Sequence, residues 1–426
     1  MRILIENVSV FQEGDILNNK NILIENDIIK EISEDKNFEK IDYVIEGKNK
    51  IALPGLVNTH THLAMTLFRG FADDLPLKEW LEEKIWPQEA KLTAEDVYWG
   101  SLLGICEMIK GGTIAFADMY FFMDEVAKAV SESGVKASLS VGMIGVSGNE
   151  NEILNRGVNF AQNWHNAENG RIKVMLAPHA PYTCPPSFLE KVINKAVEMN
   201  LSIHTHLSET YLEVENIKNI YGLTPVRLMD RIGLFNVPVL AAHCVFVDDE
   251  EIEILSEKGV GVAHNPQSNL KLASGVAPVK KMVEKRVKIG LGTDGPASNN
   301  NLDLWEEIRL VATLHKGVEK DPVCIPAKEA LNMATKNGME ILGFENSGII
   351  KEGYKADLIL VNINKPHFYP RHNLISHLVY SALSSDVDTV IVDGKVLMEK
   401  RELKILDEEK IMFEAEKRAF DLIKKR

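Results

Sequence analysis

Apolar and polar positions alternate in two different ways along this chain of 426 residues. Within residues 1–53, short apolar runs such as 3–5 are broken by turn-forming residues, which predicts closely spaced β-strands. The same pattern returns after residue 347, for example at 356–361. We therefore expect residues 1–53 plus 347–426 to form one small composite β-sandwich.

Between residues 54 and 346 the pattern changes. Short apolar runs alternate there with longer segments of helical period, which is typical of βα units around a parallel sheet. The candidate strands lie near residues 55–60, 113–118, 136–142, 172–178, 201–206, 238–243, 259–264 and 287–293. Eight strand–helix units predict an α/β fold in which residues 54–346 form a (β/α)₈ TIM barrel. Active sites of such barrels lie at the C-terminal ends of the strands.

Metal-binding residue types stand at the ends of several predicted strands. Alternate side chains of a strand share a face, so His60 and His62 can both point into the barrel. His206 and Asp294 end two later strands. Imidazole and carboxylate are ligands that first-row divalent metals prefer when no thiolate is offered. The sequence therefore predicts one divalent metal per chain on these four residues, with zinc expected and iron or manganese also compatible.

The same strand ends offer acid and base groups. A divalent metal lowers the pKa of bound water to about 7, and hydrolysis then needs groups that move protons near the leaving group. The candidates are Glu209, three residues after the third histidine, and His243, which ends the next predicted strand. We expect Asp294 to hold the metal through one oxygen and to accept the proton of the water with the other.

Composition narrows the choice of partner. The net charge of -14 argues against nucleic acid or an anionic membrane surface. No apolar run approaches the roughly 20 residues that span a bilayer. The four cysteines are far apart and form no CxxC, which favours a reducing compartment. We expect a cytoplasmic protein that acts on a small molecule and binds neither nucleic acid nor membrane.

The order of these motifs resembles the amidohydrolase superfamily over nearly the whole chain. The segments that carry the resemblance are 54–62, 206–209, His243, 264–266 and 292–294. Within that superfamily the chain is most similar to the deaminases of 5'-methylthioadenosine, S-adenosylhomocysteine and 5'-deoxyadenosine. Residues 75–81 together with 86–92 are similar to the substrate-capping loop of that group.

This resemblance implies a reaction. Water activated by the metal attacks C6 of 5'-deoxyadenosine, 5'-methylthioadenosine, S-adenosylhomocysteine or adenosine, giving the inosine analogue and ammonia. Glu209 moves a proton to the ring nitrogen, and His243 and Asp294 handle the water. Relatives of this fold are often oligomeric, so we also expect a homo-oligomer.

The resemblance further implies how the nucleoside is held. Glu89 is expected to bind the ribose hydroxyls, His179 to contact the nucleoside, and Trp80 to pack against it. Glu209 and Asp294 contact the substrate as well as acting on it.

Two alternatives remain open from the sequence. The same site could deaminate a free base such as guanine or cytosine, or hydrolyse a triazine. Glu89 discriminates against this alternative, since a ribose-binding carboxylate has no use for a free base. A catalytically silent metal- or nucleoside-binding protein is the second alternative, but Glu209 and His243 have no purpose in a mere binder.

One stretch departs from the family pattern. Some relatives clamp the amino-acid carboxylate of the 5' group with arginines after the third strand, whereas residues 140–148 contain none. This favours a small, uncharged 5' substituent, unless Arg156 reaches the pocket. The role of His264 is also open: we expect it to shape the floor of the site. Lys173 is expected at the surface, so a single metal is preferred over a pair bridged by a modified lysine.

Overall fold

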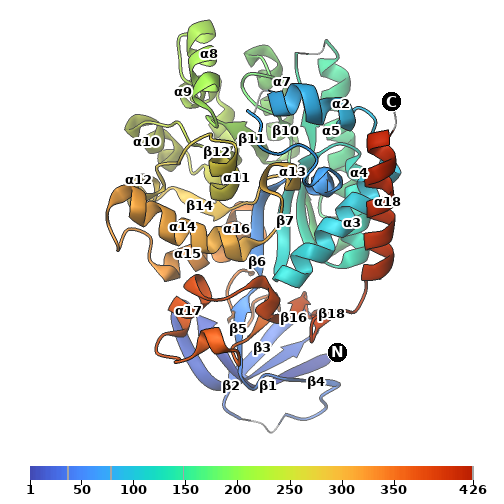
Figure 1. Ribbon diagram of the computed structural model, residues 1–426, viewed down its shortest axis with the longest axis vertical. Coiled ribbons are helices and arrows are strands. Elements are labelled where there is room, and N and C mark those ends of the chain that lie inside the picture. Colours follow the sequence, from blue (N-terminus) through green and yellow to red (C-terminus); the bar gives the residue numbers. More distant parts are fainter. Residues whose placement is uncertain (36–37, 77–78, 147, 425–426) are drawn as a thin grey trace.

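The middle of the chain forms a closed barrel of parallel strands in the computed structural model, which describes residues 1–35, 38–76, 79–146 and 148–424 (Figure 1). In the described residues its strands are β6 (Leu56–Thr61), β7 (Thr113–Tyr120), β8 (Lys136–Met143), β9 (Ile172–Val174) with β10 (Ala177–Pro178), β11 (Ile203–Leu207), β12 (Val239–His243), β13 (Gly261–His264) and β14 (Lys288–Leu291). The fourth predicted strand is thus divided into two short pieces. The (β/α)₈ prediction is confirmed.

Two ladders build the barrel wall, one from β6 to β10 and one from β11 to β14. At one seam, the His206 amide donates to the His179 carbonyl at 2.9 Å. At the other seam, the Asp294 amide donates to the His60 carbonyl at 3.0 Å. A Cβ on Gly292 would lie 2.9 Å from the His60 nitrogen, so glycine permits this close approach. Both seams therefore join residues that belong to the predicted site.

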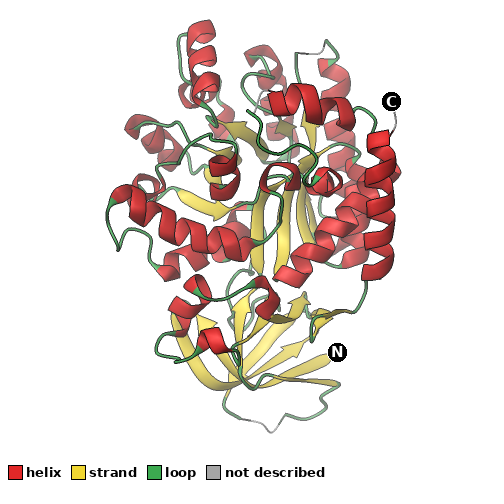
Figure 2. Cartoon of the chain, viewed as in Figure 1, coloured by secondary structure: helices red, strands yellow, loops and turns green. Residues whose placement is uncertain are grey.

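Helices cover the outside of the barrel (Figure 2). Several match the helical periods of the sequence, namely α3 (Ala94–Gly111), α7 (Pro186–Met199), α9 (Pro225–Arg231) and α10 (Asp249–Glu257). Helix α3 begins at a capping box in which Thr93 and Asp96 bond each other's backbone, and it ends at Gly112 with φ 86°. These local signals in the sequence fix where α3 begins and ends.

Both ends of the chain share one sheet below the barrel (Figure 1). In the described residues its strands are β1 (Arg2–Gln12), β2 (Asp15–Glu25), β3 (Ile28–Ser33), β4 (Tyr43–Glu46), β5 (Lys50–Pro54), β15 (Leu358–Asn362), β16 (Val387–Val392), β17 (Lys395–Glu399) and β18 (Glu402–Leu403). Strand β5 pairs antiparallel with β15, which joins the N-terminal and C-terminal segments. A small isoleucine-rich core, separate from that of the barrel, fills this module.

A buried ion-pair cluster connects the sheet with the lower end of the barrel. The ammonium of Lys136, at the start of β8, lies 2.8 Å from Asp357 and 2.7 Å from Asp393. Asp357 also accepts hydrogen bonds from the Ser347 hydroxyl at 2.6 Å and from the Asp393 amide at 2.8 Å. The Lys136 cluster therefore has its charges paired and hydrogen-bonded.

The last helix, α18 (Glu408–Lys424), leaves the sheet and packs against α3 on the outside of the barrel (Figure 1). The four cysteines are free thiols, as their spacing predicts. Among the described residues, no helix is long and apolar enough to cross a membrane.

Candidate active site

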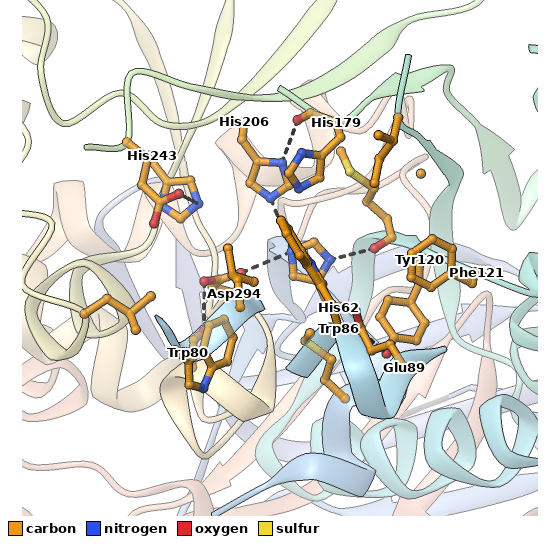
Figure 3. A pocket seen from close by; sticks show the side chains of 18 of the residues that line it. His62, Trp80, Trp86, Glu89, Tyr120, Phe121, His179, His206, His243 and Asp294 are labelled. Carbon is orange, nitrogen blue, oxygen red and sulfur yellow. Dashed lines mark hydrogen bonds and ion pairs between the residues drawn. The ribbon is translucent and has the colours of Figure 1, made fainter. Parts of the chain in front are cut away.

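Imidazoles and one carboxylate converge at the C-terminal ends of the barrel strands, where His60, His62 and His206 form one group and His60, His243 and Asp294 a second. Figure 3 shows these residues except His60. His60 and His62 end β6, His206 lies near the end of β11, and Asp294 follows β14. Asp294 Oδ1 lies 3.4 Å from His60 Nε2 and 3.3 Å from His62 Nε2. His206 Nε2 lies 3.3 Å from His62 Nε2. The structure thus brings together all four residues that the sequence nominated as ligands.

The second ring nitrogens of these histidines point away from the cluster and are held by backbone. His62 Nδ1 donates to the Met119 carbonyl at 2.6 Å, and His206 Nδ1 donates to the His179 carbonyl at 2.8 Å. Metal-ligating histidines are usually oriented in this way by a partner on the other nitrogen. Both Nε2 atoms are therefore left to face the centre of the cluster.

His60 is oriented by a chain of side chains. Its Nδ1 lies 2.9 Å from His204 Nε2, and His204 Nδ1 lies 3.4 Å from the Ser140 hydroxyl, which donates to the Asp118 carbonyl at 2.7 Å. In the described residues, the buried His60 Nε2 has no hydrogen-bond partner. A buried unpaired nitrogen is costly, and a metal at the cluster would satisfy it. The residues present therefore fit a divalent metal.

The electrostatics of the cluster agree with this assignment. Burial lowers the pKa of His60 to about 4 and that of His206 well below its usual range, so both rings are held in the neutral form that binds metals. Burial opposes protonation of His62 too, but the hydrogen bond and charge of Asp294 outweigh it and raise its pKa to about 9. The Asp294 carboxylate thus stabilises a positive charge at the centre of the cluster.

Two hydroxyls hold the other oxygen of Asp294. Ser268 and Ser298 donate to Oδ2 at 2.7 and 2.8 Å. The oxygen expected to accept a proton from water therefore already carries two hydrogen-bond donors. Behind these serines, buried Glu307 accepts from the Gln267 amide at 3.2 Å and from the Asn299 side chain at 2.7 Å. Glu307 thereby ties the loops after β13 and β14 together.

Glu209 and His243 lie beside the cluster, as their places in the sequence predict. Glu209 Oε2 lies 3.9 Å from His243 Nε2, and the Ser274 hydroxyl approaches Glu209 Oε1 at 3.4 Å. Burial raises the pKa of Glu209, against the opposing effect of His243. His243 Nδ1 lies 2.8 Å from Asn269 Oδ1 and 3.3 Å from Asn265 Nδ2, and its Nε2 faces Glu209.

The backbone at these strand ends is strained. Ser208, His243, Cys244 and Asp294 have φ values of 52°, 75°, 46° and 60°. Non-glycine residues rarely adopt positive φ, and such strain concentrates at functional sites. It turns the side chains of His243 and Asp294 into the barrel mouth.

A pocket opens beside the cluster and is lined by the other nominated residues (Figure 3). Trp80, Glu89 and His179 all line it, together with Tyr182. Glu89 accepts a hydrogen bond from the Tyr120 hydroxyl at 2.7 Å, and burial raises its pKa. Part of the predicted capping loop, residues 77 and 78, lies outside the described residues.

The residues left open by the sequence lie away from the pocket. His264 is buried with its Nε2 3.1 Å from His315 Nε2, and it does not line the pocket. Lys173 bonds the Asn166 side chain at 2.6 Å. Arg156 is an exposed partner of Glu152, one turn earlier on its own helix.

Several site residues were not nominated from the sequence. They are Tyr120 and Phe121 in the pocket wall, Ser268 and Ser298 behind Asp294, and Glu307. Of these, only Tyr120 and Phe121 could have been suspected, because they follow a predicted strand end.

Sequence relatives agree on a family. The profile of the Amidohydrolase family matches residues 51–397. A protein from Dictyoglomus thermophilum, named 5-methylthioadenosine/S-adenosylhomocysteine deaminase, is 86% identical over 425 residues and covers 100% of both chains. A protein of the same name from Carboxydothermus hydrogenoformans is 53% identical over 431 residues and covers 99% of both chains.

Solved structures share the architecture. An adenosine deaminase from Xanthomonas campestris with bound zinc superposes with a TM-score of 0.95 at 33% identity, covering 99% of this chain and 98% of that one. An atrazine chlorohydrolase from Arthrobacter aurescens, complexed with zinc, gives 0.92 at 24% identity over 98% and 100% of the two chains, which shows the common fold alone. From its profile match, its relatives and its fold, the chain belongs to the amidohydrolase family.

Proposed function

We propose that the protein hydrolytically deaminates 5'-modified adenosines at C6 and releases the inosine analogue and ammonia. The observation that carries this proposal is one pocket with Glu209 and Asp294 at the histidine cluster and Glu89 on the wall with Tyr120. Deamination of a nucleoside needs both features, because the ring must be attacked at C6 and the ribose must be bound. Relatives named for 5-methylthioadenosine and S-adenosylhomocysteine support the substrate class.

In this proposal His60, His62, His206 and Asp294 hold one divalent metal. Zinc is the expected ion, because the similar adenosine deaminase contains it, although histidine–carboxylate sites also accept iron and manganese. When bound, such a metal lowers the pKa of water to about 7 and so supplies a nucleophile at neutral pH.

The side chains of the protein then move the protons. The raised pKa of Glu209 favours the carboxylic acid form, which can donate a proton to the ring nitrogen beside C6. His243, whose Nε2 faces Glu209, accepts a proton from the attacking water. The two serine hydroxyls on Asp294 Oδ2 hold that carboxylate in position while Oδ1 faces the histidines.

Binding uses the opposite part of the pocket. Glu89 is placed to accept hydrogen bonds from ribose hydroxyls, and the Tyr120 hydroxyl fixes its orientation. Trp80 is 5% exposed and presents its ring to the pocket as a packing surface. His179, next to His206, completes the contacts with the nucleoside.

The charge of the pocket bears on the 5' substituent. Among its described lining residues there are three carboxylates and neither a lysine nor an arginine. The exposed ion pair of Arg156 with Glu152 directs that guanidinium along its own helix. A homocysteine carboxylate would therefore meet no guanidinium there. The proposal accordingly ranks 5'-deoxyadenosine and 5'-methylthioadenosine above S-adenosylhomocysteine.

Ammonia release from a substrate panel tests the proposal. The metal-loaded protein would be given adenosine, its 5'-deoxy and 5'-methylthio derivatives, S-adenosylhomocysteine, adenine, guanine, cytosine and a chlorotriazine. Turnover of nucleosides but not of free bases is the expected result. Turnover of a base or a triazine alone would overturn the substrate assignment, and equal turnover of S-adenosylhomocysteine would overturn the ranking.

A matched pair of variants locates the ribose contact. Glu89→Gln should raise KM for nucleosides roughly tenfold or more, because a charged hydrogen-bond acceptor contributes about 1.5–3 kcal/mol. Glu83→Gln, an exposed position six residues earlier, should leave KM unchanged. An unchanged KM in Glu89→Gln would contradict the assigned role.

A further inference from the structure

Helix α8 (Tyr211–Tyr221) starts two residues after Glu209 and begins with a capping motif. Thr210 and Glu213 have the spacing of a capping box, in which the acidic residue normally bonds the backbone amide of the capping residue. Thr210 fulfils its half of the motif, because its hydroxyl accepts from the Glu213 amide at 3.2 Å. The carboxylate of Glu213, however, uses its two oxygens elsewhere.

The Glu213 carboxylate reaches past the helix cap to the two residues before it. Its Oε1 accepts from the Ser208 amide at 3.0 Å, and its Oε2 accepts from the Glu209 amide at 2.8 Å. All three residues are buried. A buried amide without a partner is costly. Glu213 therefore satisfies the backbone of the turn that carries Glu209.

Two other helices show the same motif in its closed form. At the start of α3, Thr93 and Asp96 bond each other's backbone, and Asp248 and Glu251 do so at the start of α10. The carboxylate therefore completes the helix cap in α3 and α10. In α8 the carboxylate of Glu213 instead holds the preceding turn.

The other side of this turn is held by backbone. The Ser208 carbonyl accepts from the amides of Val245 and Phe246, in the loop after β12, at 3.0 and 2.9 Å. Ser208 itself has φ 52°, a conformation that must be enforced by its surroundings. The carbonyl is thus fixed by a neighbouring loop and the amides by Glu213, and the side chain of Glu209 lines the pocket from this fixed turn.

We propose that Glu213 is a positioning residue, which holds the Ser208–Glu209 turn and thereby keeps the Glu209 carboxyl where it transfers its proton. The role of Glu209 rests on the proposed deamination, whereas the hold on the turn rests on the contacts alone. Glu213 is not one of the described residues that line the pocket, so it acts through Glu209. Proton transfer needs hydrogen-bond reach, and a displacement of about 1 Å can cost roughly 10²-fold in rate.

Two variants separate the hold on the turn from the capping of the helix. Glu213→Gln keeps the length of the side chain but turns an NH2 group toward one of the amides. Glu213→Asp is too short to reach them, yet it can close the capping box as Asp96 does in α3. Both variants should lower kcat about 10²-fold while KM stays within about threefold. Glu251→Gln, in the closed box of α10, is the matched control and should leave kcat unchanged.

A double variant tests whether Glu213 acts through Glu209. In a Glu209→Gln background, the addition of Glu213→Gln should lower kcat no further, because residues that act as a unit have non-additive effects. A further loss of about 10²-fold would place the effect of Glu213 elsewhere and overturn the proposal. Wild-type kcat in either single variant of Glu213 would overturn it too.

Hydrogen–deuterium exchange of the metal-loaded chain without substrate tests the hold on the turn independently of activity. The amides of Ser208 and Glu209 should exchange at least about tenfold faster in Glu213→Gln, because their acceptor is disturbed. In Glu251→Gln they should exchange at the wild-type rate. Unchanged exchange in Glu213→Gln would overturn the proposal. A wild type that turns over no nucleoside would overturn the proposed function alone, and the exchange rates would still decide whether Glu213 holds the turn.

Discussion

Two buried polar clusters, one at each end of the barrel, are built on opposite principles. At the lower end, Lys136 lies between Asp357 and Asp393, and their contacts are complete. At the upper end, among the described residues, the buried Ser208 hydroxyl has no hydrogen-bond partner. Several residues there also hold a left-handed backbone.

This difference separates stability from chemistry. In the lower cluster the charged groups are already paired with one another. They join the sheet to the barrel and leave few free atoms for a ligand. A left-handed backbone at non-glycine residues costs folding free energy and persists only where the surrounding structure forces it. In βα barrels the upper strand ends are also where catalytic groups gather. Substitutions at the two ends should therefore affect different measurable quantities.

The largest effect is expected at the upper cluster. Glu209→Gln keeps the size of the side chain but removes its transferable proton, so kcat should fall about 10²- to 10⁴-fold. The melting temperature and the bound metal per chain should stay as in the wild type, because Glu209 is not among the four proposed ligands. Steady-state ammonia release, thermal melting and metal analysis measure the three quantities. Turnover within tenfold of the wild type would remove Glu209 from the mechanism.

A substitution in the lower cluster should reduce stability and leave turnover unchanged. Lys136→Ala leaves two carboxylates buried without their cation, which should lower the free energy of unfolding by about 3–5 kcal/mol. Turnover of the folded fraction should not change. Lys285→Ala, which removes the exposed partner of Glu253, provides the control and should cost no more than about 1 kcal/mol. Denaturant titration distinguishes the two variants.

The sequence predicted the part of the upper cluster that follows strand periodicity. His60 and His62 alternate on one strand, and His206, His243 and Asp294 each follow an apolar run. Because the ends of parallel strands meet at one edge, spacing alone was enough to bring these residues together.

The remaining site residues depend on contacts that no local pattern encodes. Ser268 and Ser298 lie on separate loops, and they meet only because Asp294 stands between them. Glu307 lies on the buried side of an ordinary amphipathic helix. The packing of α18 against the barrel is equally non-local, since its sequence shows an amphipathic helix but not which element covers it.

Glu307, a buried carboxyl behind the upper cluster, should make the stability of the protein depend on pH. Burial raises the pKa of this carboxyl from 4.5 to about 8. Its folded-state pKa therefore lies above the unfolded value, so its contribution to stability is complete below pH 4.5 and is lost as the pH rises through about 8. Glu307→Gln cannot ionise, and the difference in unfolding free energy between variant and wild type should move in favour of the variant over this range.

The expected change is about 2–4 kcal/mol between acid and alkaline pH. Glu306→Gln, one residue earlier on the exposed side of the same helix, should show no such trend. Urea titrations of the wild type, Glu307→Gln and Glu306→Gln at a series of pH values measure this change in unfolding free energy. A constant difference between Glu307→Gln and the wild type would show that this carboxyl does not change its charge on folding.

The smallest expected effect comes from relieving the backbone strain at Ser208. Ser208 has φ 52° and a buried, unpaired hydroxyl directly before Glu209. Ser208→Gly relieves both and should stabilise the protein by about 1 kcal/mol. Without that constraint Glu209 is less firmly placed, so kcat should fall while the melting temperature rises. Asn200→Gly, at φ 53° on an exposed helix end, should leave kcat unchanged. If Ser208→Gly is instead destabilising, the strain at the upper strand ends is not stored at this residue.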